Sequence, residues 1–411
     1  MMINMSIPSV KEQLEIIERG TVEILPREEL TQKLEQSFKT QIPLRVKLGC
    51  DPTRPDLHLG HSVILRKMRQ FQDLGHHTIL IIGDFTAMIG DPSGANKTRP
   101  ALTREEVVAN GKSYFEQASK ILDPEKTEIV YNSEWLSPMS FEDVIRLASH
   151  YTVARMIERD DFTKRYQNND TISLHEFLYP LAQGQDSVHL KSDIELGGID
   201  QKFNLLVGRH LQREFGQSQQ ICLMMPLLVG TDGTRKMSKS YDNYIGIDEK
   251  PEDMYGKALS IPDNLIYPYF ELVTDVAHEE LPEIRKRAVA DPRNSKHELA
   301  WILTRMYHGE DKADQARIYF ERTVIQKDMP DDMPEFVLEA DTDHGLLDVI
   351  KKTGFVPSSS EARRLVTQGG VTLDGEKVTD PRYRIETVQG SEIILKVGKR
   401  KFGKLVFRNR A

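Results

Sequence analysis

Cysteine and long hydrophobic runs are scarce in this chain, and each scarcity excludes a class of protein. Of 411 residues only Cys50 and Cys222 are cysteine, which is too few for a disulfide framework and fits a reducing compartment. The longest apolar runs, such as residues 221–229, fall well short of the roughly 18 residues that a membrane-spanning helix needs. No basic leader with an apolar core and a cleavage site opens the sequence. We therefore expect a cytoplasmic protein without a membrane segment.

Several common chemical signatures are also missing. The sequence has no Cys/His cluster at zinc-ligand spacing, no GxxxxGK[ST] element and no GxGxxG after a strand, which excludes a zinc module and a Walker-type phosphate loop. Charged residues make up 29% and hydrophobic residues 39% of the chain, an ordinary globular composition that excludes general disorder. The length favours two to four domains.

The net charge of −8 is unevenly distributed. Residues 358–411 carry twelve Lys/Arg and six Asp/Glu, so the rest of the chain has a net charge of −14. A basic end on an acidic body indicates either a module that meets a polyanion or a merely solvated tail, and charge alone does not separate the two.

Apolar strand-like runs alternate with amphipathic helices in the first part of the chain. Strands are expected at residues 45–50, 77–85, 128–132 and 220–225, and helices at 11–38 and 107–122. This alternation predicts an α/β fold with a doubly wound, parallel, Rossmann-like sheet. Residues 138–191 interrupt the alternation and are expected to form a helical insertion.

After residue 245 the strand signal fades, and a helical block is expected up to residue 327. An acidic stretch with two prolines and no basic residue follows, which is typical of a linker. In the last module Ser358 is a candidate N-cap of a helix that Gly369 ends, and Asp374-Gly375 favours a tight hairpin. The expected domains are 1–245 (α/β), 246–327 (α-helical), 328–344 (linker) and 345–411 (small α+β module).

Two histidines, His58 and His61, stand three residues apart where a loop leads into a helical pattern. Side chains at this spacing share one face of a helix, and Gly60 between them lets a flat ring approach the backbone. A helix N-terminus also favours phosphate. The alternative is a structural or metal-binding pair, for which the sequence supplies no further ligands.

A second candidate element, Lys236-Met237-Ser238-Lys239-Ser240, lies in a Gly/Thr-rich stretch after the last expected strand. Two lysines on such a loop can close over a polyphosphate and neutralise its charge. The alternative is a solvated basic loop.

Together and in this order, these elements resemble the HIGH and KMSKS signatures of class I aminoacyl-tRNA synthetases, with Leu59 as the one departure. Four further segments resemble the tyrosyl-tRNA synthetases: Asp51-Pro52-Thr53, Gly90-Asp91-Pro92-Ser93-Gly94, Tyr179-x-x-x-Gln183-x-x-Asp186 and Gly197-Gly198-Ile199-Asp200-Gln201. The last module resembles the alpha-L RNA-binding motif of the fourth small-subunit ribosomal protein, which is typical of bacterial-type tyrosyl enzymes.

This resemblance implies that tyrosine is activated by Mg²⁺-ATP and transferred to tRNA(Tyr) by a homodimer, with no tightly bound metal. It also implies an anticodon-binding role for the helical domain. The catalytic residues it implies are Thr53, His58, His61, Lys236 and Lys239. The ATP-binding residues it implies are Gly60, Arg99, Asp200, Gln201, Met237 and Ser238. The tyrosine-binding residues it implies are Asp51, Asp91, Tyr179, Gln183 and Asp186, with Asp186 accepting from the substrate hydroxyl. The RNA-binding residues it implies are Arg363, Arg364, Lys399, Arg400 and Lys401.

One departure concerns recognition of tyrosine. Many tyrosyl enzymes have a tyrosine at the position of Lys47, where it shares the substrate hydroxyl with the aspartate, whereas a subset that reads much like VKLGLDPT resembles this chain. The alternatives are a tryptophanyl-type synthetase, another nucleotidyltransferase with an HxGH element, and a non-catalytic RNA-binding protein on a synthetase scaffold.

Overall fold

The computed structural model describes residues 7–52, 56–92, 104–325, 333–340, 343–385, 390–398 and 401–408. The chain divides into two compact units, Met1–Asp314 and Gln315–Ala411. The boundary between the units falls within helix α16 (Glu310–Phe320).

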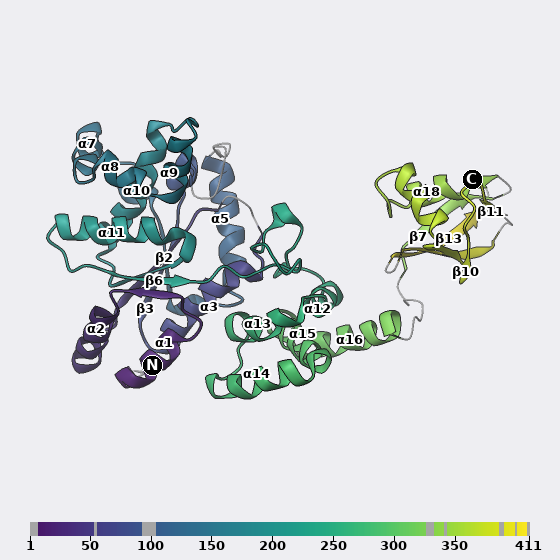
Figure 1. Cartoon of the computed structure of the whole chain (residues 1–411), viewed down its shortest axis with the longest axis horizontal. Coiled ribbons are helices and arrows are strands. Elements are labelled where there is room, and N and C mark those ends of the chain that lie inside the picture. Colours follow the sequence, from purple (N-terminus) through teal and green to yellow (C-terminus); the bar gives the residue numbers. More distant parts are fainter. Residues whose placement is uncertain are drawn as a thin grey trace. The chain divides into compact units, whose positions relative to one another are not determined.

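A six-stranded sheet forms the centre of the first unit among the described residues (Figure 1). Its strands are β1 (Glu23–Leu25), β2 (Arg45–Cys50), β3 (His77–Ile82), β4 (Thr127–Tyr131), β5 (Ile194–Gly198) and β6 (Ile221–Met225). The strand order is β1-β6-β5-β2-β3-β4, and every neighbouring pair is parallel except β1 with β6. The winding of the chain reverses between β2 and β5, which confirms the predicted doubly wound parallel sheet.

Helices cover both faces of this sheet because its central strands are apolar on both sides. Ile79 and Ile81 of β3 pack with Ala182 of α10 (Leu174–Leu190) on one face. Ile82 points to the other face, where a Cβ on Gly111 of α5 (Arg104–Ala118) would lie 3.1 Å from its Cγ2. Helix α11 (Lys202–Glu214) packs on α10 and on strands β5 and β6. This two-sided burial is typical of parallel sheets.

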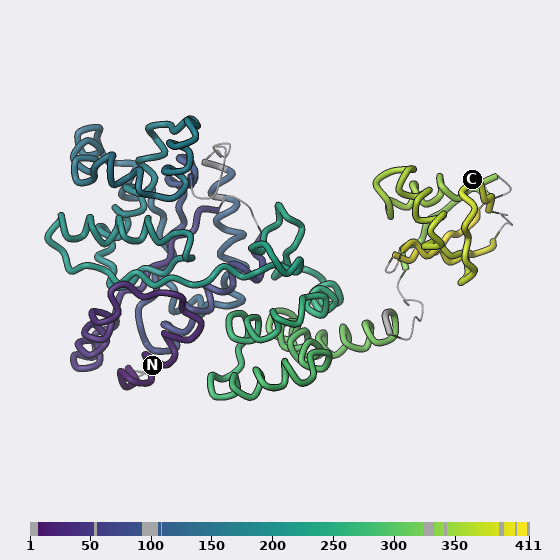
Figure 2. The backbone as a smooth tube through the Cα atoms, in the orientation of Figure 1, coloured from purple at the N-terminus to yellow at the C-terminus, as the bar shows by residue number. Residues whose placement is uncertain are grey.

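Along the chain, the remaining helices of the first unit come before the strands of the sheet, between them or after them, and Figure 2 traces the backbone in chain order. The helices before the first strand or between strands are α1 (Val10–Glu18), α2 (Arg27–Thr40), α3 (Leu59–Asp73), α4 (Thr86–Ile89) and α6 (Ser133–Leu136). The expected helical insertion contains α7 (Phe141–Ser149), α8 (Val153–Ile157), α9 (Asp160–Gln167) and α10. The helical block contains α12 (Pro251–Leu259), α13 (Ile266–Val273), α14 (Leu281–Ala290), α15 (Pro292–His308) and the start of α16.

Two strands of the six-stranded sheet were not expected from the sequence. The segment 11–38, interpreted as helical throughout, contains β1 between α1 and α2, because three residues are too few to show a strand period. Strand β5 carries Glu195 among its apolar residues and ends in two glycines, so it lacks the composition of a buried strand.

The second unit has its own small sheet and core. Its strands follow the order β10-β9-β12-β13-β7 among the described residues, and β8 (His344–Gly345) pairs with β11 (Arg384–Ile385). The bounds are β7 (Glu335–Glu339), β9 (Val371–Leu373), β10 (Glu376–Lys377), β12 (Glu392–Val397) and β13 (Lys401–Arg408). Helices α17 (Leu346–Lys352) and α18 (Ser359–Thr367) pack on it around buried residues such as Ile350 and Phe407.

The predicted local signals of this module are present. The Ser358 side chain accepts from the Glu361 N–H at 3.3 Å and caps α18. Asp374 and Gly375 have φ values of 47° and 86°, which makes the tight turn between β9 and β10.

The predicted linker at 328–344 is wrong for residues 335–339. These residues form β7, which pairs in parallel with β13 from Lys404 to Arg408. The sequence does not indicate this strand, because only Leu338 of β7 is buried and its charged residues are typical of a solvated segment. In the part of the chain that the structure describes, no helix combines the length and the apolar character needed to cross a membrane.

Candidate active site

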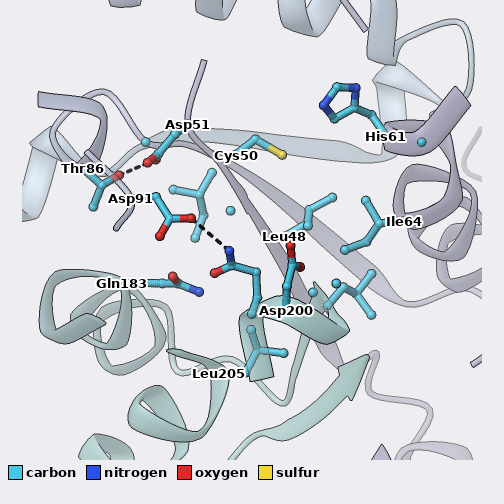
Figure 3. Close-up of a pocket in the computed structure, with 18 of the residues that line it drawn as sticks. Leu48, Cys50, Asp51, His61, Ile64, Thr86, Asp91, Gln183, Asp200 and Leu205 are labelled. Carbon is cyan, nitrogen blue, oxygen red and sulfur yellow. Dashed lines mark hydrogen bonds between the residues drawn. The ribbon is translucent and has the colours of Figure 1, made fainter. Parts of the chain in front are cut away.

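A cavity of about 420 Å³ opens at the carboxyl ends of β2 and β5, where the winding of the sheet reverses. Open parallel sheets bind their ligands at this position. Figure 3 shows Asp51, Asp91 and Gln183 on one side of the cavity and His61 on another. The sequence-predicted residues that line it are Asp51, His58, Gly60, His61, Asp91, Tyr179, Gln183, Asp186, Asp200, Gln201, Lys236, Met237 and Ser238.

Among the described residues predicted to act in catalysis or to bind ATP or tyrosine, Lys239 is the one that does not line the cavity. Lys239 is next to the lining residues and forms an ion pair with Asp56. Thr53 and Arg99 lie outside the described residues.

His58 is the N-cap residue of α3, and His61 lies in the first turn of the same helix. The Gly60 N–H donates to His58 Nδ1 at 3.1 Å, and the His58 N–H donates to His61 Nδ1 at 3.2 Å. Because both Nδ1 atoms accept, the proton of each neutral ring is on Nε2. A Cβ on Gly60 would lie 2.8 Å from His58 Cε1, so the position requires glycine.

Both imidazoles are neutral at pH 7. Burial, followed by the neighbouring His61 and Lys239, lowers the pKa of His58 to about 2. Burial and Lys239 lower the pKa of His61 to about 4. The two rings, whose centroids are 4.0 Å apart, therefore present neutral N–H donors to the cavity.

The segment from Lys236 to Ser240 is fixed by residues around it. Met237 is buried, and its N–H donates to the Leu228 carbonyl at 2.7 Å. Asn243 accepts from the Ser238 N–H at 2.8 Å and donates to the Lys236 carbonyl at 3.1 Å. Lys236 Nζ lies 3.3 Å from Asp200 Oδ2.

Hydrogen bonds hold the carboxylate of Asp51 at one end of the cavity. Its two oxygens accept from Thr86 Oγ1 at 2.7 Å and from the Tyr179 hydroxyl at 2.8 Å. A Cβ on Gly83 would lie 2.0 Å from Asp51 Oδ1, so this approach also requires glycine. Burial and Asp51 raise the pKa of Tyr179 well above its usual value, which keeps its hydroxyl a donor.

Asp91 and Gln183 belong to one network with residues that the sequence did not indicate. Gln201 Nε2 donates to Asp91 Oδ2 at 2.9 Å, and Arg159 Nη2 lies 3.5 Å from Asp91 Oδ1. Asn204 Nδ2 donates to Gln183 Oε1 at 3.1 Å and to Gln201 Oε1 at 2.8 Å.

Asp186 lies at another part of the cavity wall and is 3% exposed. Its Oδ1 accepts from Trp135 Nε1 at 2.9 Å, and Asn132 Nδ2 lies 3.5 Å from its Oδ2. Burial raises the pKa of Asp186 to about 7, against the opposing effects of the Lys47 charge and of these two donors. Neither Trp135 nor Asn132 stands in a pattern that marks it in the sequence.

Lys47, the departure noted in the sequence, does not line the cavity. Its side chain has no exposed surface, and its Nζ lies 2.8 Å from Glu195 Oε1, which is equally buried. The Lys47 ammonium therefore faces Glu195 and does not line the cavity.

Of the residues expected to bind RNA, Arg363 and Arg364 are exposed on α18, and Lys401 is exposed at the start of β13. Lys399 and Arg400 lie outside the described residues. No group of three His, Cys, Asp or Glu side chains that could hold a metal ion is present among the described residues.

The chain matches two family models. Residues 39–324 match the class I tRNA synthetases (W and Y), and residues 345–393 match the S4 domain. The chain is therefore a member of the class I tRNA synthetases, and a non-catalytic RNA-binding scaffold is not favoured.

The curated relatives narrow the assignment. Tyrosine–tRNA ligase from Salinibacter ruber is 56% identical over 98% of both chains, and that from Chlorobaculum tepidum is 58% identical over 98% of both. A solved structure of tyrosyl-tRNA synthetase from Archaeoglobus fulgidus, complexed with L-tyrosine, has a TM-score of 0.61 at 25% identity and covers 75% of this chain and 99% of that one. Within its class, the chain belongs to the tyrosine–tRNA ligases. This confirms the resemblance seen in the sequence, and a tryptophanyl-type enzyme is not favoured.

Proposed function

We propose that this ligase carries out both steps of its reaction in the cavity at the carboxyl ends of β2 and β5. First, the carboxylate of L-tyrosine attacks the α-phosphorus of ATP, which gives tyrosyl-adenylate and releases pyrophosphate. A hydroxyl at the 3′ end of tRNA(Tyr) then attacks the tyrosyl carbonyl, and AMP leaves. The observation that carries this proposal is that one cavity has Asp51 and Asp91 on one side and His61 on another (Figure 3). His58 and Lys236 also line it.

The carboxylate side suits tyrosine. Tyr179, Gln183 and Asp186 are spaced four and three residues apart on α10, so they share one face of that helix. In the proposed arrangement, Asp51, Asp91, Tyr179 and Gln183 surround the ammonium group, and Asp186 accepts a hydrogen bond from the phenol. Phenylalanine has no hydroxyl to donate, so this buried carboxylate would lose the hydrogen bond from the phenol, which is the physical basis for rejecting phenylalanine.

The imidazole and lysine side suits the phosphates of ATP. His58 and His61 offer neutral N–H donors at the N-terminus of α3, whose dipole favours negative charge. Lys236 and Lys239, paired here with Asp200 and Asp56, would exchange those partners for the β- and γ-phosphates and stabilise the charge that develops on pyrophosphate.

The other assignments at this end rest on the resemblance. Asp200 and Gln201 are assigned to the ribose side of the adenylate, and Gly60, Met237 and Ser238 to ATP contact. Thr53 and Arg99 stay assigned to the phosphates by resemblance alone. Mg²⁺ enters as part of the substrate Mg²⁺-ATP, carried by its phosphates.

We also propose that the protein works in the cytoplasm as a homodimer. The helical insertion exposes large apolar side chains, including Phe141 at 80%, Val153 at 62% and Leu174 at 82% exposure. Large apolar side chains with this much exposure favour a protein interface, and in the proposed dimer a second copy of the chain would cover them. The basic residues Arg363, Arg364, Lys399, Arg400 and Lys401 are assigned to the tRNA backbone, and the helical block 246–327 to the anticodon end of the tRNA.

The test is amino-acid-dependent ATP–pyrophosphate exchange with tyrosine, phenylalanine and tryptophan in parallel. Exchange with tyrosine alone is expected. Tyrosine-dependent exchange that survives His61→Ala and Lys236→Ala together would show that the reaction occurs elsewhere.

A further inference from the structure

A buried ion pair lies directly behind the wall of the tyrosine side of the cavity. Lys47 and Glu195 are opposite each other on the parallel strands β2 and β5, and their side chains are 0% and 1% exposed. Neither residue lines the cavity. A buried ion pair is weak grounds for stability, because desolvation of the two charges offsets most of their attraction. Its presence at this position therefore calls for another role.

Glu195 is the acceptor on which several donors converge. Besides Lys47 Nζ at 2.8 Å, its oxygens accept from Gln183 Nε2 at 3.0 Å and from Ser187 Oγ at 3.3 Å, and Gln220 Nε2 also donates to it. An ionised carboxylate can only accept hydrogen bonds. Lys47 Nζ, 2.8 Å from Glu195 Oε1, supplies the positive charge that pairs with this carboxylate.

This constraint fixes the orientation of the Gln183 side-chain amide. Because Glu195 accepts only, the amino end of the amide, Nε2, must face it. The opposite end, Oε1, accepts from Asn204 Nδ2 at 3.1 Å and has a second lone pair. Since Gln183 lines the cavity, this carbonyl oxygen is the end of the amide that suits a cation. If Glu195 were neutral, it could also donate, and the reversed amide would present N–H groups that repel an ammonium.

We propose that Lys47 and Glu195 are positioning residues for the substrate ammonium, since their ion pair orients the Gln183 amide with its carbonyl oxygen toward that group. The inference rests on the proposed contact between Gln183 and the ammonium of tyrosine. It gives the lysine of this chain a role at the ammonium end of the substrate, although the tyrosine it replaces in many relatives serves the hydroxyl end.

The test compares two ligands that differ only in the ammonium group: L-tyrosine and 3-(4-hydroxyphenyl)propionate. The variant is Lys47→Met/Glu195→Gln, which removes both charges together and keeps the side chains close to their original size. Its dissociation constant for tyrosine, measured by calorimetry, is expected to rise about tenfold to a hundredfold, the effect of losing one hydrogen bond to a charged group. Its dissociation constant for the propionate is expected to change less than about twofold. An equal loss for both ligands, or no loss for tyrosine, would overturn the inference.

Two further variants separate the inference from the contact on which it rests. Gln183→Met removes the amide itself. If this variant binds tyrosine normally, the proposed ammonium contact is wrong. If it binds tyrosine weakly while Lys47→Met/Glu195→Gln does not, the contact stands and the positioning role fails. Should the double variant not fold, Lys47→Gln/Glu195→Gln also removes both charges and allows a hydrogen bond between the two side chains, and the same selective loss for tyrosine is expected.

A matched control removes another, partly buried ion pair, that of Arg165 and Glu176, whose side chains are 13% and 2% exposed. Neither residue lines the cavity. Arg165→Met/Glu176→Gln is expected to leave the affinities for both ligands unchanged, so a loss that it reproduces would reflect general destabilisation.

Discussion

The indole Nε1 of Trp135 donates a hydrogen bond of 2.9 Å to Oδ1 of Asp186, the carboxylate proposed to recognise the tyrosine hydroxyl. The indole ring also stacks on His189, with centroids 4.4 Å apart and planes 14° from parallel. Trp135 therefore fixes the carboxylate from behind and favours its ionised form. Recognition of the phenol depends on a residue that does not itself contact the phenol in the proposed arrangement.

Trp135→Phe tests this dependence. Phenylalanine preserves an aromatic ring but removes the N–H donor, so the KM for tyrosine in pyrophosphate exchange is expected to rise about tenfold or more. The preference for tyrosine over phenylalanine should fall with it. Trp301→Phe is the matched control, because Trp301 Nε1 donates to Asp314 at the same distance of 2.9 Å and does not line the cavity. Equal behaviour of the two variants would contradict the role of Trp135.

The affinity for tyrosine should depend on pH through Asp186. Burial, with a smaller contribution from Glu195, raises the pKa of this carboxyl to about 7, and Lys47 opposes the shift. Below pH 7 the carboxyl is protonated and accepts poorly from the phenol. The dissociation constant for tyrosine, measured from pH 5.5 to 8.5, should therefore decrease as the pH rises and level off about one pH unit above this pKa.

Asp186→Asn is the control for this pH dependence, since its profile should be flat. His58 and His61 do not contribute, because their pKa values of about 2 and about 4 lie below the pH range of the measurement. Lys67, whose pKa burial lowers to about 7, donates to three carbonyls near the end of α1 and is still present in the Asn variant. A change that survives Asp186→Asn would therefore point to Lys67. The raised pKa also means that the folded protein binds the proton more tightly than the unfolded chain, so stability from this group decreases as the pH rises from about 4 to 7.

The parts of the site that the sequence predicted are those with local patterns. His58 and His61 share the start of one helix, and Tyr179, Gln183 and Asp186 share a face of α10. In each case the spacing along the chain sets the spacing in space, so motif and geometry coincide.

The parts that the sequence did not predict are single polar residues brought in from far along the chain. Trp135 is 51 residues from Asp186, and Glu195 is 148 residues from Lys47. Lys47 stands out as a departure from related sequences. Its partner Glu195 lies on β5, which the sequence does not indicate as a strand because it contains a charge and two glycines. Only the parallel register of β2 and β5 places the two residues side by side.

The exposed ion pair between Lys239 and Asp56 predicts a competition with ATP. Asp56, whose side chain is 60% exposed, pairs with the ammonium group of Lys239, which in the proposed arrangement binds the phosphates of ATP. Asp56→Asn is expected to lower the KM for ATP by roughly two- to fivefold, the range for an exposed ion pair. The effect should shrink at high salt. Asp248→Asn, which breaks the comparable exposed pair with Lys120, should leave this KM unchanged, and a similar decrease in that variant would contradict the competition.

Removing residues 333–411, which include the described strands of the second unit, should separate the two steps of the reaction. Strand β7 pairs with β13, so a truncation must also remove residues 335–339, and the appropriate deletion is 333–411. Pyrophosphate exchange should stay within about twofold of the full chain, because every described residue that lines the cavity lies between Leu48 and Ser238. Charging of tRNA(Tyr) should fall by about a hundredfold or more, since the deleted unit carries the basic residues assigned to the tRNA backbone.

The variant Arg363→Glu/Arg364→Glu tests the same division with the chain intact. This variant should charge tRNA more weakly, and the charging should depend less on salt, because binding with fewer phosphate contacts releases fewer counterions. Both residues are exposed on α18, so the reversal of charge should not disturb the fold. A parallel fall of exchange and charging in either protein would show that the second unit also supports tyrosine activation.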